Sequence, residues 1–517
     1  MRPLYRDAWI TFGLIALTVG LYFCSIHGSF IYDDLEQILT NPAIHGFGGV
    51  FRMVESGLRQ SRFVMNLSFA FNWWLSGADT WSYHVLNVVM HLGNALLLRR
   101  FLSRILPENH FVVISTVALF LLHPLQAQSV AYVMGRISLL ECMTFLLALN
   151  LVIERGTRRN HWLLGMLLFL SPLVKETSVL LPGVLFLYWL TIGSENLRDL
   201  DLKGRWTYFI PWLSGVAWFR WSHVDNYSGI VGFQLFPPGE YFLTQMYYVL
   251  FRLKLLFYPA GQSLLHEYPS FSPGIFIFGV LGFALLSGIA IVGWRVRKSS
   301  RVLAFFLGFF LLTLAPIGTV LQFVNPFAEY RLYLSNISIF FMMALALDRI
   351  IGRSQKKILP VFLLGGLLIV FSFSTWQENL LWADPLLLVE SSLDQYPQSD
   401  LLYSTLGWQL AARGRYGEAE KAYLESDRLN TLYGRNKTAR QKILLVVLYE
   451  EQGLWVKARA AIEALPVSLL SLGPPQAYFQ HYLKILKALH DESRFQVVYQ
   501  DGLKWYSSSV LLAMVSQ

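Results

Sequence analysis

Eleven long apolar runs dominate the first 375 residues of this 517-residue chain. Hydrophobic residues make up 55% of the sequence and charged residues only 15%, whereas soluble domains carry about 25% charged residues. A water-soluble fold could not bury so much apolar surface, so the sequence excludes a purely soluble enzyme and predicts an all-α, polytopic membrane protein. The runs are Ala8–Cys24, Trp81–Leu98, Phe111–Leu122, Ile137–Ile153, Trp162–Leu173, Ser178–Ile192, Trp206–Phe219, Gly274–Trp294, Val302–Val320, Leu332–Leu347 and Ile358–Phe373.

Basic clusters between the runs predict the orientation. With eleven spans, the clusters at 99–104, 155–159, 203–205, 295–301 and 349–357 all fall on the same side as Arg2 and Arg6. Cytoplasmic loops carry the excess of Lys and Arg, so we expect a cytoplasmic N-terminus and a first outer loop at about residues 25–80. The basic excess of residues 1–375, 28 Lys and Arg against 18 Asp and Glu, then reports orientation and not nucleic-acid binding.

One apolar segment does not fit this count. Tyr241–Tyr258 carries Arg252 and Lys254, and the later basic clusters would be inverted if this segment crossed the membrane. We therefore expect it to form a re-entrant or interfacial helix on the outer side.

Residues 376–517 form a second predicted domain, on the outer side of the membrane. A first pair of helices matches the tetratricopeptide pattern, in which small residues let paired helices approach. A weaker copy and a degenerate third pair at Gln476–Tyr499 follow. A generic helical bundle is the alternative. The first copy matches the pattern at Tyr403, Leu406, Gly407, Leu410, Gly414, Tyr416, Ala419 and Tyr423.

Polar side chains near the ends of the runs are the candidates for chemistry. Asp33 and Asp34 stand a few residues beyond the first run, where they are either solvated interfacial charge or a general base, a metal ligand or both. His84, Asn87 and His91 share one helix face. This face is predicted to point into the protein, for interior hydrogen bonds or for catalysis.

Further charges fall in later outer loops. Lys175 and Glu176 follow the fifth run, and Glu329 and Arg331 precede the tenth. Local ion pairing is the simple interpretation of these pairs. However, Asp33, Asp34, Arg136, Lys175, Glu176, Glu329 and Arg331 are all predicted on one side of the membrane, and converging carboxylates and cations suit a phosphate-bearing ligand beside a proton acceptor.

These segments together resemble the transmembrane and tetratricopeptide-repeat protein O-mannosyltransferases, and more widely the polyprenyl-phosphate-sugar glycosyltransferases of the C-type membrane fold. The resemblance covers about residues 1–430 in unbroken order. The matching pieces are Phe30-Ile31-Tyr32-Asp33-Asp34 with Asn41, Tyr83-His84-x-x-Asn87 with His91, His123-Pro124 through Gly135-Arg136, Lys175-Glu176, Ala328 through Leu334, Trp376, Trp382 and the first repeat.

The resemblance implies a reaction and roles for these residues. Such enzymes pass a sugar, with inversion, from a polyprenyl-phosphate carrier to a hydroxyl of a secreted protein, and an acidic residue of the first outer loop is the base. That role falls on Asp33 or Asp34. Arg136, Lys175 and Arg331 are expected to bind the carrier phosphate. His84, His91, Glu176 and Glu329 are expected to support the site.

The resemblance also implies the surroundings of the enzyme. No cofactor is required beyond the lipid-linked sugar, and a divalent metal ion on the two aspartates stays open. Besides membrane lipids, the partner is an acceptor protein held by the repeats. The short repeat array indicates a bacterial inner-membrane protein with a periplasmic site. The alternatives are an enzyme of the same fold that modifies lipid or cell-wall glycan or moves an oligosaccharide, and a non-enzymatic membrane scaffold or transporter.

Overall fold

The computed structural model describes residues 2–55, 62–154, 158–193, 209–221, 237–267, 271–319, 327–353, 358–432, 440–465, 476–504 and 511. Within these residues every regular element is a helix and none is a strand, which confirms the predicted all-α class. The chain divides into two compact units, Met1–Pro385 and Leu386–Gln517.

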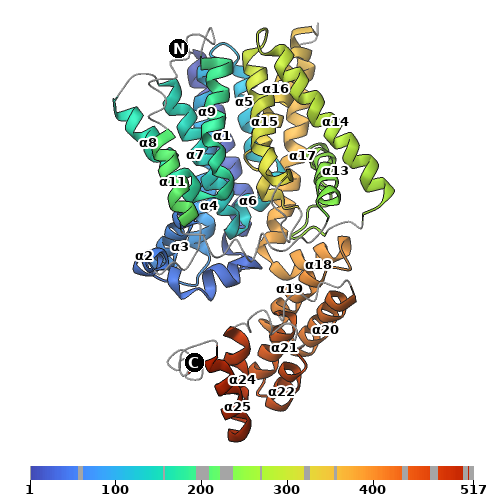
Figure 1. Ribbon diagram of the computed structural model, residues 1–517. Coiled ribbons are helices and arrows are strands. Elements are labelled where there is room, and N and C mark those ends of the chain that lie inside the picture. Colours follow the sequence, from blue (N-terminus) through green and yellow to red (C-terminus); the bar gives the residue numbers. More distant parts are fainter. Residues whose placement is uncertain are drawn as a thin grey trace. The chain divides into compact units, whose positions relative to one another are not determined.

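The first unit is a bundle of apolar helices (Figure 1). Short helical turns join them, and two of these turns, Glu176–Leu180 and Glu329–Leu332, carry predicted site residues. The helices are α1 (Arg2–Tyr22), α2 (Phe47–Glu55), α3 (Phe63–Ser76), α4 (Trp81–Ile105), α5 (His110–Leu122), α6 (Ala127–Ala131), α7 (Arg136–Ile153), α8 (Arg158–Val174), α9 (Leu181–Tyr188), α11 (Phe209–Trp221), α13 (Pro238–Phe257), α14 (Pro273–Val296), α15 (Arg301–Thr319), α16 (Asn336–Arg353) and α17 (Ile358–Ala383).

Six helical segments in the described residues are long and apolar enough to cross a bilayer, so the protein is an integral membrane protein. A seventh span is obtained if α5 and Pro124–Ala131, which meet at 56°, form one broken span. Every predicted run overlaps a helix, although the first residues of Trp206–Phe219 and the last of Val302–Val320 lie outside the described residues. Because Phe209–Trp218 and Arg301–Ala315 are short, the number of eleven spans stays a prediction.

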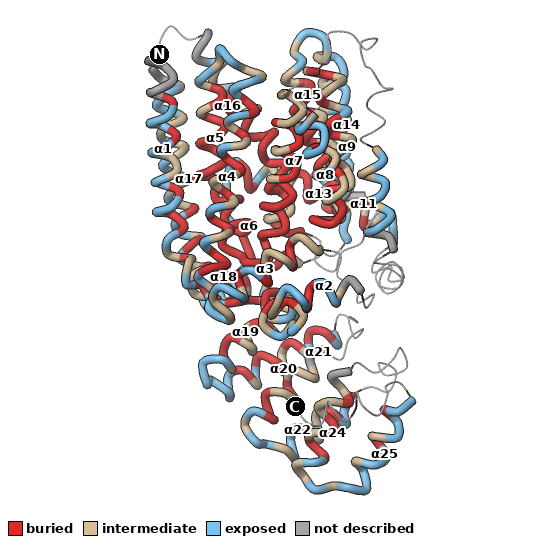
Figure 2. The backbone as a smooth tube through the Cα atoms, turned by 90° about the vertical axis from the view of Figure 1, so that its left-hand side faces the viewer, coloured by how far each residue is buried: buried red, intermediate tan, exposed pale blue. Residues whose placement is uncertain are grey.

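Burial separates central helices from peripheral ones (Figure 2). The share of residues in the most apolar stretch of a candidate span that are buried inside the protein is 72% for Val133–Ile153, which contains α7. It is only 17% for α14 and 11% for Val361–Ala383 of α17. Phe276, Ile277 and Phe278 of α14 are among the exposed apolar side chains. In a membrane protein such surfaces face lipid, so α7 lies at the centre of the unit and α14 at its edge.

The predicted first outer loop contains a helix, and the exceptional apolar segment forms a long helix. Helix α3 lies within the predicted loop and packs on α4 and α8, because Phe69 and Ala70 turn an apolar face inward. The segment predicted as a re-entrant or interfacial helix is α13, which packs along α14 and also contacts α15. Whether α13 crosses the membrane stays a prediction.

The second unit contains three successive helix pairs at the predicted positions. A short helix, α18 (Pro385–Gln395), precedes them. Within each pair the two helices pack on each other, and the tetratricopeptide assignment stays a prediction. The pairs are α19 (Asp400–Ala411) with α20 (Tyr416–Leu432), α21 (Arg440–Glu451) with α22 (Trp455–Glu463), and α24 (Gln476–Ala488) with α25 (Glu492–Leu503).

Close helix approach in the first pair depends on Gly407. A Cβ atom added there would lie 2.6 Å from Cδ1 and Cε1 of Tyr423, whose side chain is buried. We expect Gly407→Ala to lower the free energy of unfolding of this unit by about 1–3 kcal/mol through overpacking. Gly417→Ala is the matched control, since nothing lies within 4 Å of its added Cβ. Equal thermal unfolding curves for the two variants would contradict this account.

Candidate functional site

A strained turn presents the paired aspartates. Tyr32 has a φ of 54°, in the left-handed region that non-glycine residues rarely adopt. Asp34 stabilises the turn, because its Oδ2 accepts the Ile31 N–H at 3.1 Å. Its Oδ1 accepts the N–H of Met134, which is 100 residues away, at 2.9 Å. Asp34 therefore ties the first outer loop to the segment that begins α7.

The two aspartates lie in different environments. Asp34 is 1% exposed, and burial raises its pKa well above the usual range, although the two backbone N–H groups act in the opposite direction. Asp33 is only partly buried. The carboxylate that a ligand can reach is therefore that of Asp33, while both oxygens of Asp34 are already engaged.

Arg136 is enclosed by hydrogen-bond acceptors. Its guanidinium donates to the side chains of Asn87 at 2.7 Å and Asn72 at 2.6 Å, to the Tyr83 carbonyl at 2.8 Å, and to Ser68. The side chain is 0% exposed. These bonds join α3, α4 and α7, and they occupy the donors that a phosphate would need. Arg136 therefore holds α3, α4 and α7 together in the interior. Its charge also acts on the Asp34 carboxylate.

Lys175 is paired inside the bundle with a residue that the sequence analysis did not single out. Its Nζ lies 2.6 Å from Oε2 of Glu141 on α7, and the two side chains are 8% and 6% exposed. The Thr177 hydroxyl donates to the other Glu141 oxygen. The Lys175 charge is thus already compensated within the protein.

Glu176 lies on the opposite side of this short segment. Its carboxylate pairs with Nε of Arg62 at 3.4 Å, and both side chains are partly exposed. The charges of Glu176 and Asp33 both act on Arg62. Arg62, at the start of α3, therefore links the first outer loop to the Lys175-Glu176 segment.

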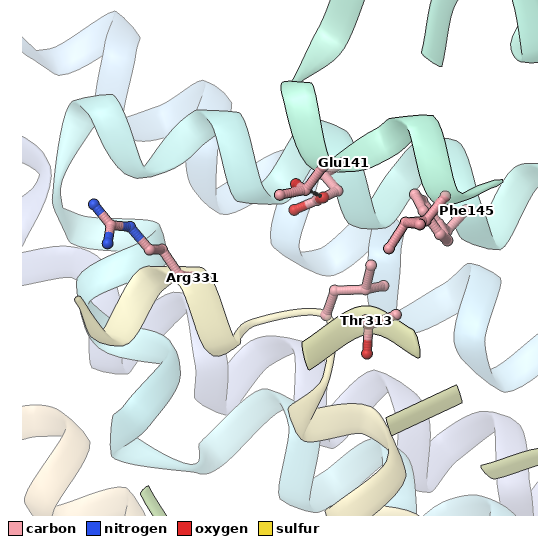
Figure 3. A pocket seen from close by; sticks show the side chains of 7 residues that line it. Glu141, Phe145, Thr313 and Arg331 are labelled. Carbon is pink, nitrogen blue, oxygen red and sulfur yellow. Dashed lines mark hydrogen bonds between the residues drawn. The ribbon is translucent and has the colours of Figure 1, made fainter. Parts of the chain in front are cut away.

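Arg331 lines a small pocket between α7, α15 and the turns at Glu176–Leu180 and Glu329–Leu332. Figure 3 shows the pocket between the Glu141 and Phe145 side chains of α7 and Thr313 of α15. The Arg331 guanidinium points away from Glu141 in this view. The pocket has an acidic wall, an apolar wall and a basic rim; its lining residues are Glu141, Phe145, Thr177, Leu180, Thr313, Arg331 and Leu334.

Glu329 holds a loop in place. Its carboxylate accepts hydrogen bonds from the Gln262 side chain at 3.0 Å and the Ser263 N–H at 3.1 Å. It also lies 2.9 Å from Nε2 of His266, and both side chains are buried. Glu329 thus anchors the chain that follows α13 to the turn that carries Arg331.

The polar face of α4 points into the protein, as predicted. His84 hydrogen-bonds the Gly28 carbonyl at 2.9 Å, and His91 Nδ1 lies 2.7 Å from the Tyr333 hydroxyl. Asn87 holds Arg136. All three α4 side chains are buried. They therefore make interior hydrogen bonds, and their support of the site stays a prediction.

These contacts bring most of the predicted residues into one region of the first unit. Asp33 is linked through Arg62 to Glu176, and the neighbouring Lys175 leads through Glu141 to the pocket bordered by Arg331. Among the described residues no group of three or more His, Cys, Asp or Glu side chains is arranged to hold a metal ion.

Several residues of this region were missed from the sequence. Glu141 had a detectable signal, since a carboxylate inside a membrane helix marks a functional site by default. Arg62 had none. Tyr132, in the matched segment from His123 to Arg136, was given no role from the sequence. Its buried hydroxyl makes no hydrogen bond among the described residues, and the charges of Asp33 and Asp34 act on it.

The curated proteins to which this chain is similar share one name, protein O-mannosyl-transferase. No family model matches the chain. The chain is 23% identical to a protein O-mannosyl-transferase of Caenorhabditis elegans over 81% of its own length and 62% of the relative's. It is 24% identical to the protein O-mannosyl-transferase Tmtc3 of Drosophila melanogaster, over 79% of the chain and 54% of the relative. The human protein O-mannosyl-transferase TMTC1 is 28% identical over 37% of the chain and 25% of the relative.

Among solved structures, ArnT from Cupriavidus metallidurans, bound to undecaprenyl phosphate, aligns with a TM-score of 0.38 and 13% identity. The alignment covers 76% of this chain and 80% of that one. The chain spans less than two thirds of the length of the curated relatives named above, and its bacterial origin stays a prediction. The resemblance inferred from the sequence is confirmed to this extent: the homologues of this chain are named as protein O-mannosyl-transferases.

Proposed function

We propose that this protein is a membrane glycosyltransferase that moves a sugar from a polyprenyl-phosphate carrier to a Ser or Thr hydroxyl of a protein, with inversion and with Asp33 as the base. The observation that carries the proposal is the difference between the two aspartates. Both carboxylate oxygens of Asp34 accept backbone hydrogen bonds. Asp33 is only partly buried and lies near the Arg62–Glu176 pair. The names of the homologues supply the acceptor class and the sugar.

The proposed step is an inverting displacement. A Ser or Thr hydroxyl is a weak nucleophile at neutral pH, so a carboxylate must accept its proton as the new glycosidic bond forms. Asp33 is suited to this step, and Glu176, held by Arg62, lies in the same charge cluster. The bond between the sugar and the carrier phosphate breaks as this happens, and the phosphate gains negative charge that fixed cations stabilise.

The cations divide into two groups under this proposal. Arg331, at the rim of the pocket, contacts the departing phosphate. Arg136 and Lys175 act as positioning residues and not as phosphate ligands, because their donors already face buried acceptors of the protein. The resemblance implied that Arg136 and Lys175 bind the carrier phosphate, and the proposal replaces that role with a positioning role for both.

The remaining parts of the proposal concern the location and the acceptor. We place the N-terminus in the cytoplasm, the Asp33 region on the outer side of a bacterial inner membrane, and the binding of acceptor protein on the helix pairs of Leu386–Gln517. The basic clusters support the orientation. Paired-helix repeats support the last point, since such arrays offer concave surfaces to extended peptides.

The test is a transfer assay with purified full-length protein in lipid nanodiscs. Radiolabelled undecaprenyl-phosphate mannose or dolichyl-phosphate mannose is supplied with a mixture of Ser- and Thr-rich peptides, and labelled peptide is counted. We expect radioactive label on the peptides, and we expect β-elimination to release this label from them. Label found only in lipid or cell-wall glycan acceptors would favour the rival transferase, and no transfer to any acceptor would sink the proposal.

A further inference from the structure

Arg252 on α13 is a buried cation that the proposed reaction has not used. It is 5% exposed, and its Nε makes no hydrogen bond with any described residue. Within the described part of the chain no carboxylate forms an ion pair with it. An unpaired buried charge is costly in any protein, and more so in one embedded in a membrane. A buried ionisable side chain of this kind marks a candidate ligand site.

The charge that acts most strongly on Arg252 is also positive. After burial, the strongest influence on Arg252 is the charge of Arg331, and together they lower the pKa of Arg252 to about 9. Two guanidinium groups whose charges repel each other create a region of positive potential. An anion between them would remove the repulsion and use the donors of both.

Aromatic packing fixes Arg252 in this place. The Arg252 guanidinium carbon lies 5.4 Å from the centre of the Phe327 ring. Phe327 in turn stacks on Tyr248 of α13, with ring centres 5.2 Å apart and planes 12° apart. A cation over an aromatic face is only partly compensated, so this packing positions the charge without satisfying its donors.

The turn that carries Arg331 is fixed to the same helix. Glu329 bonds the loop at Gln262–His266, which directly follows α13, and Phe327 begins the segment that leads to Arg331. His123 Nε2 also holds the carbonyl of Leu256 near the end of α13, at 2.9 Å. Both arginines are thus mounted on elements that are tied together, as a preorganised anion site requires.

We propose that Arg252 and Arg331 together form the binding site for the phosphate group of the lipid carrier, with Arg252 as the residue that holds the phosphate before and after sugar transfer. This inference rests on the proposed function and deepens it. A tetrahedral phosphate suits two guanidinium forks, which donate in pairs to its oxygens. It also explains why a segment otherwise apolar enough to span carries an arginine.

The experiment measures binding without catalysis. Wild-type protein in nanodiscs is titrated with undecaprenyl phosphate, which carries no sugar, and separately with inorganic phosphate. We expect Arg252→Gln to weaken the binding of undecaprenyl phosphate by about tenfold to a hundredfold, the range for hydrogen bonds to a charged group. Arg252→Lys, which keeps the charge but loses the fork, should fall between. Lys254→Gln is the matched control, because Lys254 is exposed on the same helix and bonds the Ala260 carbonyl.

Each outcome decides the proposal. Wild-type affinity in Arg252→Gln would overturn it, and so would equal losses in Arg252→Gln and Lys254→Gln. If Arg252→Gln fails to fold, Arg252→Lys decides in the same way: unchanged affinity overturns the proposal and weakened affinity supports it. Competition by inorganic phosphate supports recognition of the phosphate itself, whereas wild-type protein that binds inorganic phosphate but not undecaprenyl phosphate overturns the lipid assignment.

The inference can fail separately from the proposed function. Loss of carrier binding in Arg252→Gln, together with absence of sugar transfer in the wild type, would keep the phosphate site and reject the transferase. Sugar transfer with an unchanged donor KM in Arg252→Gln would keep the transferase and reject the site.

Discussion

Asp33→Asn is expected to lower kcat for sugar transfer by about 10²–10⁴-fold, the contribution of a positioned general base. The amide cannot accept the proton of the acceptor hydroxyl, whereas its size and its hydrogen-bonding capacity are nearly unchanged. Because Asp33 is only partly buried, the variant should unfold at the wild-type temperature. The measurement is the initial rate with saturating donor, beside a thermal unfolding curve of the same preparation.

Asp34→Asn tests the structural role of Asp34 separately from the role of Asp33 as the base. The new amide N–H would face the backbone N–H of Ile31 or Met134, where an oxygen now accepts. We expect a loss of about 1–3 kcal/mol in the free energy of unfolding, the cost of leaving a buried group unsatisfied. Normal rates in Asp33→Asn, with catalysis lost in a stable Asp34→Asn, would exchange the two assignments.

Glu141→Gln is expected to destabilise the first unit by about 3–5 kcal/mol, the cost of breaking a buried ion pair on one side. Lys175 would keep its charge in a space where its side chain is only 8% exposed. The measurement is thermal unfolding in detergent. Glu176→Gln is the control: its partner Arg62 is 39% exposed, and breaking a pair that water can reach costs about 0–1 kcal/mol.

A double variant tests the cause of that loss. Glu141→Gln combined with Lys175→Met removes both charges and leaves side chains of similar size. Since the double variant leaves no uncompensated charge in the interior, it should recover most of the lost stability. If it unfolds as readily as Glu141→Gln alone, the charge imbalance is not the cause and the pair has another role.

The helices could be predicted because their signal is local. The length and apolarity of the runs place a helix on each of them, and the turn glycines of the second unit mark its helix pairs. Helix α3 was missed since its run, Phe63–Ser76, is interrupted by Asn66 and Asn72. Both asparagines are buried, and Asn72 accepts a hydrogen bond from Arg136. The polar residue in this apolar run is therefore explained by a partner on α7, far along the chain.

The candidate site was predictable as a region but not in its roles. Motif order indicated that Asp33, Lys175 and Arg331 belong together. It could not distinguish Asp33 from Asp34, because that difference depends on the Met134 N–H, which only the tertiary structure brings to Asp34. Likewise, the sequence left Lys175 with either a local ion pair or a phosphate as its partner, and only its 2.6 Å contact with Glu141 shows which charge compensates it.

The segment Lys175-Glu176-Thr177 has a mechanical consequence. Alternate side chains bind Glu141 on one flank, while the central one binds Arg62 on the other. Three consecutive residues cannot shift independently, so a displacement at one flank is transmitted to the other within a single peptide length. A ligand that displaced Glu141 would therefore also displace Glu176 and its partner Arg62.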